Sequence, residues 1–277
     1  LAVGSWLAEA WILLLNTDGT VKANTRAVYG NTFTQPRSLA RLGDLDGDGL
    51  PELVAGEPNV APSGSAWILY LRADGTLRTK RKIPTPHSGE SGTLAPVAFG
   101  SSAAPLGDLD GDGVLDLAIG DPSANDGADD RGAVWIFFLN ADGSVESSRR
   151  LGNGTRAFHG ELDLGDRFGS ALASHDLDGD GTLELCVCAL GDDDGQSDGG
   201  AAWLCFLRPD GSVEREHKIS MTAGGFGSGL SADFARSAAF CADLDGNGGA
   251  ELLLGAPQAF SPDQLSGVYW MLSLAGP

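Results

Sequence analysis

The sequence predicts an all-β fold, a β-propeller of four-stranded antiparallel blades. Two motifs recur through the 277 residues, an acidic loop and a tryptophan-containing strand that runs into an Asp-Gly hairpin. Both return about every 67 residues, a period typical of propellers and other repeat architectures. Each period has room for about four short strands, and no segment carries a 3.6-residue apolar period long enough for a helix. We therefore expect about four blades that carry an acidic loop, plus an amino-terminal half blade.

The acidic loop has the composition of a calcium site. Its first copy runs from Asp44 to Glu52 and reads Asp-Leu-Asp-Gly-Asp-Gly-Leu-Pro-Glu. Oxygen atoms at positions 1, 3, 5 and 9, with the carbonyl of position 7, can surround one hard cation, and glycine at position 6 permits the sharp turn. Without a metal, so many carboxylates in one loop would repel one another. The loops therefore predict up to four Ca²⁺ ions, and the predicted ligands are Asp44, Asp46, Asp48, Leu50, Glu52, Asp108, Asp110, Asp112, Val114, Asp116, Asp176, Asp178, Asp180, Thr182, Glu184, Asp243, Asp245, Asn247, Gly249 and Glu251.

The loops differ from helix–loop–helix calcium sites. Such sites need a bidentate glutamate at position 12, where this chain has Ala55, Ile119, Val187 and Leu254. Each loop runs instead into a short apolar stretch bounded by glycine or proline, which is typical of a buried strand. We expect each acidic loop to connect two strands.

The second motif places one tryptophan per repeat, at Trp11, Trp67, Trp135, Trp203 and Trp270. The first four are followed by an Asp-Gly hairpin and a further strand. Because each ring lies among Ile, Leu or Met neighbours, we expect the tryptophans to pack between blades. A ladder of exposed platforms for glycans is the alternative.

Further residues around the acidic loops carry a family resemblance. Each loop is preceded by a Phe-Gly pair or a variant of it, and three are followed by Gly-x-Pro. The pairs are Phe33-Thr34, Phe99-Gly100, Phe168-Gly169 and Phe234-Ala235, and the Gly-x-Pro motifs start at Gly56, Gly120 and Gly255. This pattern resembles the FG-GAP repeat of the integrin α-chain β-propeller over nearly the whole chain. The resemblance implies Ca²⁺ in hairpin loops on one face of a disc.

Three repeats depart from that pattern. The first lacks the glycine of Phe-Gly, and the third has Cys188-Ala189-Leu190 in place of Gly-x-Pro. The fourth has Asn247 at loop position 5, which supplies an oxygen but no charge. The fourth calcium site should therefore be the weakest.

We expect a single propeller, or a segment of one, over residues 1–277. The expected units are a half blade over 1–32, repeats over 33–98, 99–167 and 168–233, and a last repeat over 234–277 that lacks its final strand. Three interpretations of the ring stay open. The chain is a segment of a longer protein, or the amino-terminal hairpin completes the last blade, or neighbouring chains cover the open edges. The first and third are favoured.

Composition limits the function. With 38 acidic and 18 basic residues the net charge is −20, which argues against nucleic acid and against anionic membrane surfaces. No stretch approaches the roughly 20 apolar residues of a membrane-spanning helix, so we expect no membrane insertion in this segment. Neither Gly-x-Ser-x-Gly nor His-Glu-x-x-His occurs, so no catalytic residue is assigned and we do not expect an enzyme.

The pattern favours an extracellular structural or adhesive module, secreted or on a cell-surface ectodomain. Its expected partner is a protein, a glycan or a neighbouring chain of an assembly, because the resembling family presents loops of the disc to partners. A carbohydrate-active enzyme on a propeller scaffold, a lyase or hydrolase, is the alternative. The sequon Asn153-Gly154-Thr155 predicts glycosylation of Asn153.

Four cysteines, Cys186, Cys188, Cys205 and Cys241, lie in the second half of the chain. They form no Cys-x-x-Cys pair, which argues against zinc. A cross-strand disulfide to Cys205 and small buried thiols are both open.

Overall fold

The computed structural model describes residues 2–4, 9–28, 37–60, 63–86, 98–124, 130–225, 233–257, 260–261, 264–265 and 267–274. Every regular element in this part of the chain is a β-strand. Three sheets have four antiparallel strands in chain order. They comprise β4 (Ser38–Gly43), β5 (Glu52–Glu57), β6 (Ser65–Leu71) and β7 (Leu77–Ile83); β8 (Ser102–Gly107), β9 (Asp116–Asp121), β10 (Ala133–Leu139) and β11 (Val145–Gly152); and β12 (Phe168–His175), β13 (Glu184–Ala189), β14 (Ala201–Leu207) and β15 (Val213–Ile219).

The sheets at the two ends of the chain have three strands each. The first holds β1 (Ala2–Gly4), β2 (Glu9–Leu15) and β3 (Val21–Val28), so the expected half blade gains a short third strand. The last holds β16 (Ser237–Cys241), β17 (Glu251–Ala256) and β20 (Val268–Ser273), with a small hairpin of β18 (Phe260–Ser261) and β19 (Gln264–Leu265) before β20. Among the described residues, the β2–β3 hairpin pairs with β1 and shares no sheet with β16, β17 and β20.

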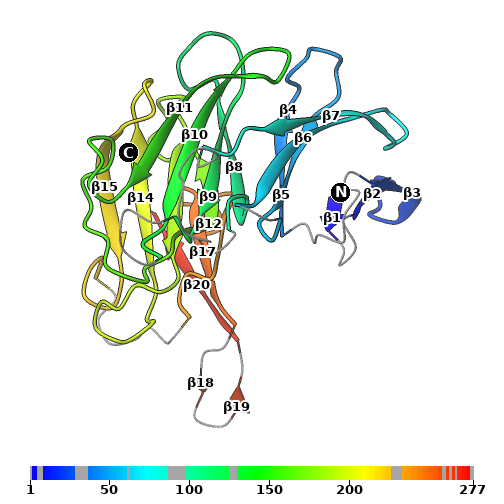
Figure 1. Cartoon of the computed structure of the whole chain (residues 1–277). Coiled ribbons are helices and arrows are strands. Elements are labelled where there is room, and N and C mark those ends of the chain that lie inside the picture. Colours follow the sequence, from blue (N-terminus) through cyan, green and yellow to red (C-terminus); the bar gives the residue numbers. More distant parts are fainter. Residues whose placement is uncertain are drawn as a thin grey trace.

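The sheets follow one another as propeller blades (Figure 1). The first strands of successive blades, β4, β8, β12 and β16, pack against one another. The fourth strands β7, β11 and β15 each end their sheet at the outer rim. The prediction of an all-β propeller with four-stranded antiparallel blades is therefore confirmed. The repeat boundaries at residues 32, 98, 167 and 233 stay a prediction.

Backbone contacts between glycines explain the Phe-Gly and Gly-x-Pro motifs. A Cβ atom on Gly56 would lie 1.9 Å from the carbonyl oxygen of Gly100 in the next blade, and one on Gly120 would lie 2.0 Å from that of Gly169. Gly100 and Gly169 have φ angles of 93° and 92°, where side chains are disfavoured. The Ser102 hydroxyl donates to the Gly169 carbonyl at 2.7 Å. Gly56 and Gly120 of Gly-x-Pro thus each receive the Phe-Gly turn of the following blade.

The boundary between the third and fourth loop-bearing blades departs from this pattern. The buried Cys188 replaces the first glycine, and Ala235 replaces the second while keeping a φ of 58°. A non-glycine residue at such a φ carries strain. Gly200 still approaches the Phe234 carbonyl oxygen, since a Cβ there would lie at 2.1 Å.

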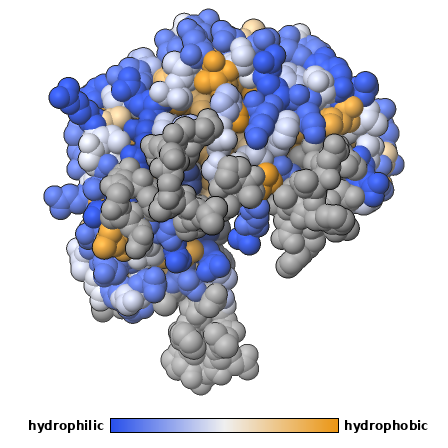
Figure 2. Space-filling view, in the orientation of Figure 1, coloured by the Kyte–Doolittle hydropathy of each residue, from blue (hydrophilic) through white to orange (hydrophobic). Residues whose placement is uncertain are grey.

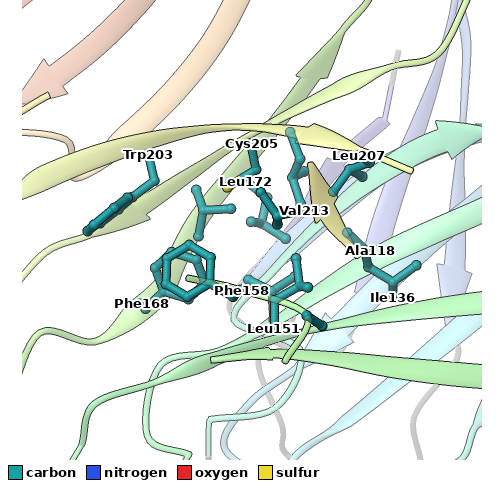
Figure 3. Packing of buried hydrophobic residues seen from close by; sticks show 14 of the residues in the cluster. Ala118, Ile136, Leu151, Phe158, Phe168, Leu172, Trp203, Cys205, Leu207 and Val213 are labelled. Carbon is teal, nitrogen blue, oxygen red and sulfur yellow. The ribbon is translucent and has the colours of Figure 1, made fainter. Parts of the chain in front are cut away.

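Aromatic rings fill the space between blades (Figure 3). The Phe158 ring lies 4.9 Å from that of Phe168 and 5.3 Å from that of Trp203, centroid to centroid. Trp203 is buried. Trp67 and Trp135 are half-buried, and each packs against a separate cluster of buried hydrophobic residues. Their predicted packing role is confirmed. Trp11 is 37% exposed, so the pattern weakens toward the first blade.

The four cysteines are free thiols. Cys186 and Cys188 belong to the cluster against the last blade, whereas Cys205 belongs to the cluster on the other side of the sheet. Cys205 therefore lies on the face opposite to Cys186 and Cys188, so the cross-strand disulfide is wrong. The interpretation as small buried thiols is confirmed for Cys186, Cys188 and Cys205, whereas Cys241 is half-buried.

Candidate metal centres

All four acidic loops connect the first strand of a blade to its second. They lie between β4 and β5, β8 and β9, β12 and β13, and β16 and β17. Since the blades share one strand order, the loops emerge at the same end of their sheets. We name them L1 (44–52), L2 (108–116), L3 (176–184) and L4 (243–251).

Each loop brings three carboxylates together. In every group, the atoms offered as ligands lie within 4.8 Å of one another. The groups are Asp44, Asp46 and Asp48 in L1; Asp108, Asp110 and Asp116 in L2; Asp176, Asp178 and Glu184 in L3; and Asp243, Asp245 and Glu251 in L4. The predicted ligands Glu52, Asp112 and Asp180 fall outside these groups.

The first aspartate of each loop is held by backbone amides. Asp44 accepts the N–H groups of Gly47 and Gly49, both at 2.9 Å. Asp108 accepts those of Gly111 and Gly113 at 2.9 Å, and the pattern recurs in L3 and L4. The loop backbone therefore fixes one carboxylate of each group before any ligand arrives.

Position 5 is organised in the same way. Its side-chain oxygen accepts the N–H of position 7, at 2.7 Å from Val114, Thr182 and Gly249 and at 2.9 Å from Leu50. The sequence also predicts that the backbone carbonyl oxygens of position 7 bind the metal, and this stays a prediction.

The carboxylate at position 9 is buried in every loop. Glu52 accepts the Leu45 N–H at 2.6 Å through Oε2, and Glu251 accepts the Leu244 N–H at 2.7 Å. The Oε1 atoms of Glu52 and Glu251 are buried with no hydrogen-bond partner among the described residues. Burial raises the pKa of Glu52 and of Glu184, because it disfavours the charged form. A buried, unpartnered carboxylate oxygen beside an acidic cluster fits a bound cation.

L2 has a shorter acid at position 9. The carboxylate of Asp116 accepts two backbone N–H groups, from Leu109 at 2.9 Å and from Leu139 at 3.2 Å. Burial nevertheless raises its pKa to about 6, and the hydrogen bonds from the two amides offset only part of this effect.

Two arginines next to the loops were not predicted from the sequence. Arg78 pairs with Asp46 and, at 2.8 Å, with Asp48, while Arg215 pairs with Asp178 at 2.9 Å. Each guanidinium also lies over an aromatic ring of the neighbouring strand, Tyr70 or Phe206. Arg215 lies directly opposite Phe206 in the strand register, whereas Arg78 falls at the register shift next to Tyr70, so no single sequence position marks both arginines.

A further acidic group lies in the loop after β13. Asp192 is buried, and Lys218 Nζ lies 2.7 Å from Oδ2 of both Asp192 and Asp194. The nearby carboxyl of Asp166 is also buried, which raises its pKa to about 6. Here a lysine supplies the cation, so this group is not a candidate calcium site.

Asn153 is half-buried in the turn after β11. Its Oδ1 faces the Leu162 N–H at 3.5 Å, and the Thr155 hydroxyl of the sequon donates to the Gly152 carbonyl at 2.9 Å. Glycosylation at this position stays a prediction.

Sequence comparison agrees with the repeat geometry. Residues 44–119, which span L1, L2 and the strands between them, match the family described as FG-GAP-like repeat. Residues 44–119 are thus similar to an FG-GAP-like repeat. It is 36% identical over 163 residues to integrin alpha-5 of Xenopus laevis, across 54% of this chain and 14% of that protein. It is 31% identical over 157 residues to integrin alpha-PS2 of Drosophila melanogaster, across 54% of this chain and 11% of that protein.

A relative of another kind also matches. The phosphatidylinositol-glycan-specific phospholipase D of Rattus norvegicus is 27% identical over 213 residues, which is 67% of this chain and 24% of that protein. The chain spans less than a quarter of the length of each of these relatives.

Proposed function

We propose that this FG-GAP chain is a calcium-stabilised propeller module that binds a protein partner outside the cell. The observation that carries the calcium part is the convergence of three carboxylates within 4.8 Å in each of four loops in one register. The buried, unpartnered oxygens of Glu52 and Glu251 support it, because desolvated carboxylates favour a cation.

The residues that would hold Ca²⁺ are the acids at positions 1, 3, 5 and 9, with Asn247 at position 5 of L4. Bound Ca²⁺ supplies positive charge that cancels the repulsion within each loop. The chain's own amides hold the first carboxylate of each group in place, so little loop entropy is lost on binding.

The adhesive part of the proposal rests on the similarity to integrin alpha chains. A protein is the expected partner, and a glycan is the alternative. The face seen in Figure 2 is mostly hydrophilic, with apolar residues in small separate spots. Such a surface suits a partner bound by polar and charged groups. In the described part of the chain, no helix has the length and apolar composition to span a membrane.

The phospholipase D relative does not transfer an activity to this chain, since the match covers 24% of that protein. A lyase or hydrolase function therefore has no observation in its favour beyond the scaffold.

Calcium titration tests the proposal. Protein stripped with chelator and then dialysed is titrated with Ca²⁺ and, separately, with Mg²⁺ in a calorimeter. We expect up to four calcium-binding events and weak binding of Mg²⁺, which requires a stricter octahedral shell. The Asp108→Asn and Asp176→Asn variants should each lose one event. Absence of calcium binding by the wild type would remove the central part of the proposal.

A further inference from the structure

Strand β7 is an unusually basic element in an acidic chain. Five of the 18 basic residues lie within 72–82, although the net charge is −20. Strand β7 itself contains Arg78, Lys80, Arg81 and Lys82 and no acidic residue. The corresponding strands β11 and β15 mix both signs, with Glu146 in β11 and two glutamates in β15. The corresponding strand β3 has two basic residues, Lys22 and Arg26, and no acid, so β7 with four is the most basic of these strands.

A groove follows the edge of this strand. It has a volume of about 770 Å³, and the five consecutive residues 78–82 line it together with Asp46, Tyr70, Ala141 and Asp142. Successive side chains of a strand point to opposite faces. A groove that touches five in a row therefore runs along the backbone edge and not across one face.

The edge of β7 is suited to strand addition. In the described part of the chain, β7 is the last strand of its sheet and pairs with β6 on one side. An exposed strand edge is a template for another extended segment, which gains affinity through main-chain hydrogen bonds. The groove is bounded by L1 through Asp46 and by the next blade's hairpin through Ala141 and Asp142.

The cations of the groove have different surroundings. Arg78 pairs with L1, and Arg81 pairs with Asp142 at 3.0 Å, so both arginines are fixed against the walls. Lys80 and Lys82 are exposed and have their ammonium groups 4.6 and 6.0 Å from the Trp67 ring centroid. Residues two apart on a strand share one face and lie about 6.6 Å apart, the repeat of alternate side chains in a paired extended peptide.

We propose that the edge of β7 is the docking strand for an extended acidic peptide segment of a partner protein. Its acidic side chains pair with Lys80 and Lys82, and its backbone pairs with that of β7. Opposite charges across adjacent strands stabilise such a pairing. A short acidic segment fits better than a long polyanion, because the net charge of −20 repels the latter outside the groove. This inference rests on the proposed function only for the choice of a protein as partner.

The probe is a short fluorescent peptide of alternating threonine and glutamate, measured by anisotropy in calcium buffer at low salt. Two control peptides are the threonine–lysine analogue and an acidic peptide of equal charge with proline at alternate positions, which cannot pair along a strand. The protein variants are Lys80→Glu with Lys82→Glu, and the milder Lys80→Gln with Lys82→Gln. The matched control is Lys22→Glu with Arg26→Glu on strand β3, which changes the net charge equally.

We expect the acidic peptide to bind the wild type and the β3 control alike, and to lose about tenfold or more in affinity on charge reversal at β7, as for a specific pair of charges at an interface. The proline peptide should bind at least about tenfold more weakly than the threonine–glutamate peptide. Several results overturn the proposal: no binding at about 1 mM peptide, equal binding by the β7 variants, or binding of an acidic oligosaccharide but not of the peptide. The proposal is also overturned if the Gln variant self-associates while the wild type binds no peptide. In that case Lys80 and Lys82 protect the strand edge against association between copies of the chain. Calcium titration of the same samples tests the calcium proposal separately.

Discussion

Loops L1 and L3 differ from L2 and L4 in their neighbours, although all four share one ligand pattern. In L1 and L3 an arginine of the fourth strand pairs with the loop carboxylates. Beside L2 the positions of Arg78 and Arg215 are taken by Glu146 and Ser147. In L4 the Ser273 hydroxyl donates to Asp245 at 2.6 Å, and the Asn247 amide donates to Ser273 at 2.7 Å.

This difference shows that a repeated motif does not make equal sites. The guanidinium groups compensate part of the negative charge in L1 and L3 when calcium is removed, and they compete with calcium when it returns. L2 has four acids and no such compensation from its fourth strand, so it should depend most on the metal. L4 has only three acids and should bind calcium most weakly.

The largest expected effect is that of removing calcium from the whole chain. A ligand that binds only the folded state at about 100 times its Kd stabilises by about 2.7 kcal/mol per site. Chelator should therefore lower the Tm steeply, and Ca²⁺ should restore it better than Mg²⁺. Hydrogen exchange measured in chelator should rise most across β8 and β9, next to L2. A larger rise across β4 and β5, next to L1, would break the comparison.

The next effect is a pH dependence that comes from L2. In metal-free protein, burial raises the pKa of Asp116 from 3.8 to about 6. The folded state then binds the proton more tightly than the unfolded state. The contribution of Asp116 to the free energy of unfolding is therefore complete below pH 4 and is lost as pH rises through 6. The loss is of the order of 3 kcal/mol. Urea unfolding between pH 4.5 and 7.5 in chelator should show this decline in the wild type.

The Asp116→Asn variant isolates that effect, because it removes the titrating group. Its free energy of unfolding should decline less over the same pH range than that of the wild type. Glu184→Gln in L3 should act in the same direction, since burial also raises the pKa of Glu184. Parallel pH profiles for the wild type and Asp116→Asn would exclude Asp116 as the source.

A smaller effect concerns the charge of L4. Asn247→Asp adds the fourth carboxylate, and ligand charge is one of the factors that set calcium affinity. We expect the affinity of the weakest site to rise by about tenfold, or about 1.4 kcal/mol. Calorimetric titration checks this, and Asp112→Asn in L2 should produce the opposite change. Unaltered affinity in both variants would mean that position 5 does not contact the metal.

The smallest effect is expected for Arg78→Gln. Exposed ion pairs are weak, so the calcium affinity of L1 should rise only about two- to fivefold once the competing guanidinium is gone. The Tm in chelator should fall slightly, because the guanidinium no longer compensates the loop's negative charge. The variant thus binds calcium more tightly but is less stable without it. Arg149→Gln is the matched control, because Arg149 pairs with Asp210 of the next hairpin at 3.3 Å and not with a loop. Equal behaviour of the two variants would remove arginine from the comparison.

The sequence predicts the blades and the loops because both depend on local patterns. The acids of each loop lie within nine residues, and the apolar stretch after each loop becomes the second strand. The pairing of Arg78 with Asp46 could not be predicted in this way, because it joins residues 32 apart through the register of β6 and β7. The position of Glu52 outside the L1 group could not be predicted either, because Glu184 and Glu251 accept the equivalent backbone N–H and yet lie within their groups.

The contact between Gly56 and Gly100 has a consequence for how the protein folds during its synthesis on the ribosome. Gly56 belongs to one repeat and the Phe99-Gly100 turn to the next. The Ser38 hydroxyl also donates a hydrogen bond to the Gly100 carbonyl, 62 residues further along the chain. A blade that has emerged completely still lacks its neighbour's turn, so its inner edge stays unfinished until the first residues of the next repeat follow. Because chains are made from the amino terminus, each repeat supplies the closing piece for the one before it. The blades of β4–β7 and β8–β11 are thus each completed only when the start of the following repeat has been synthesised.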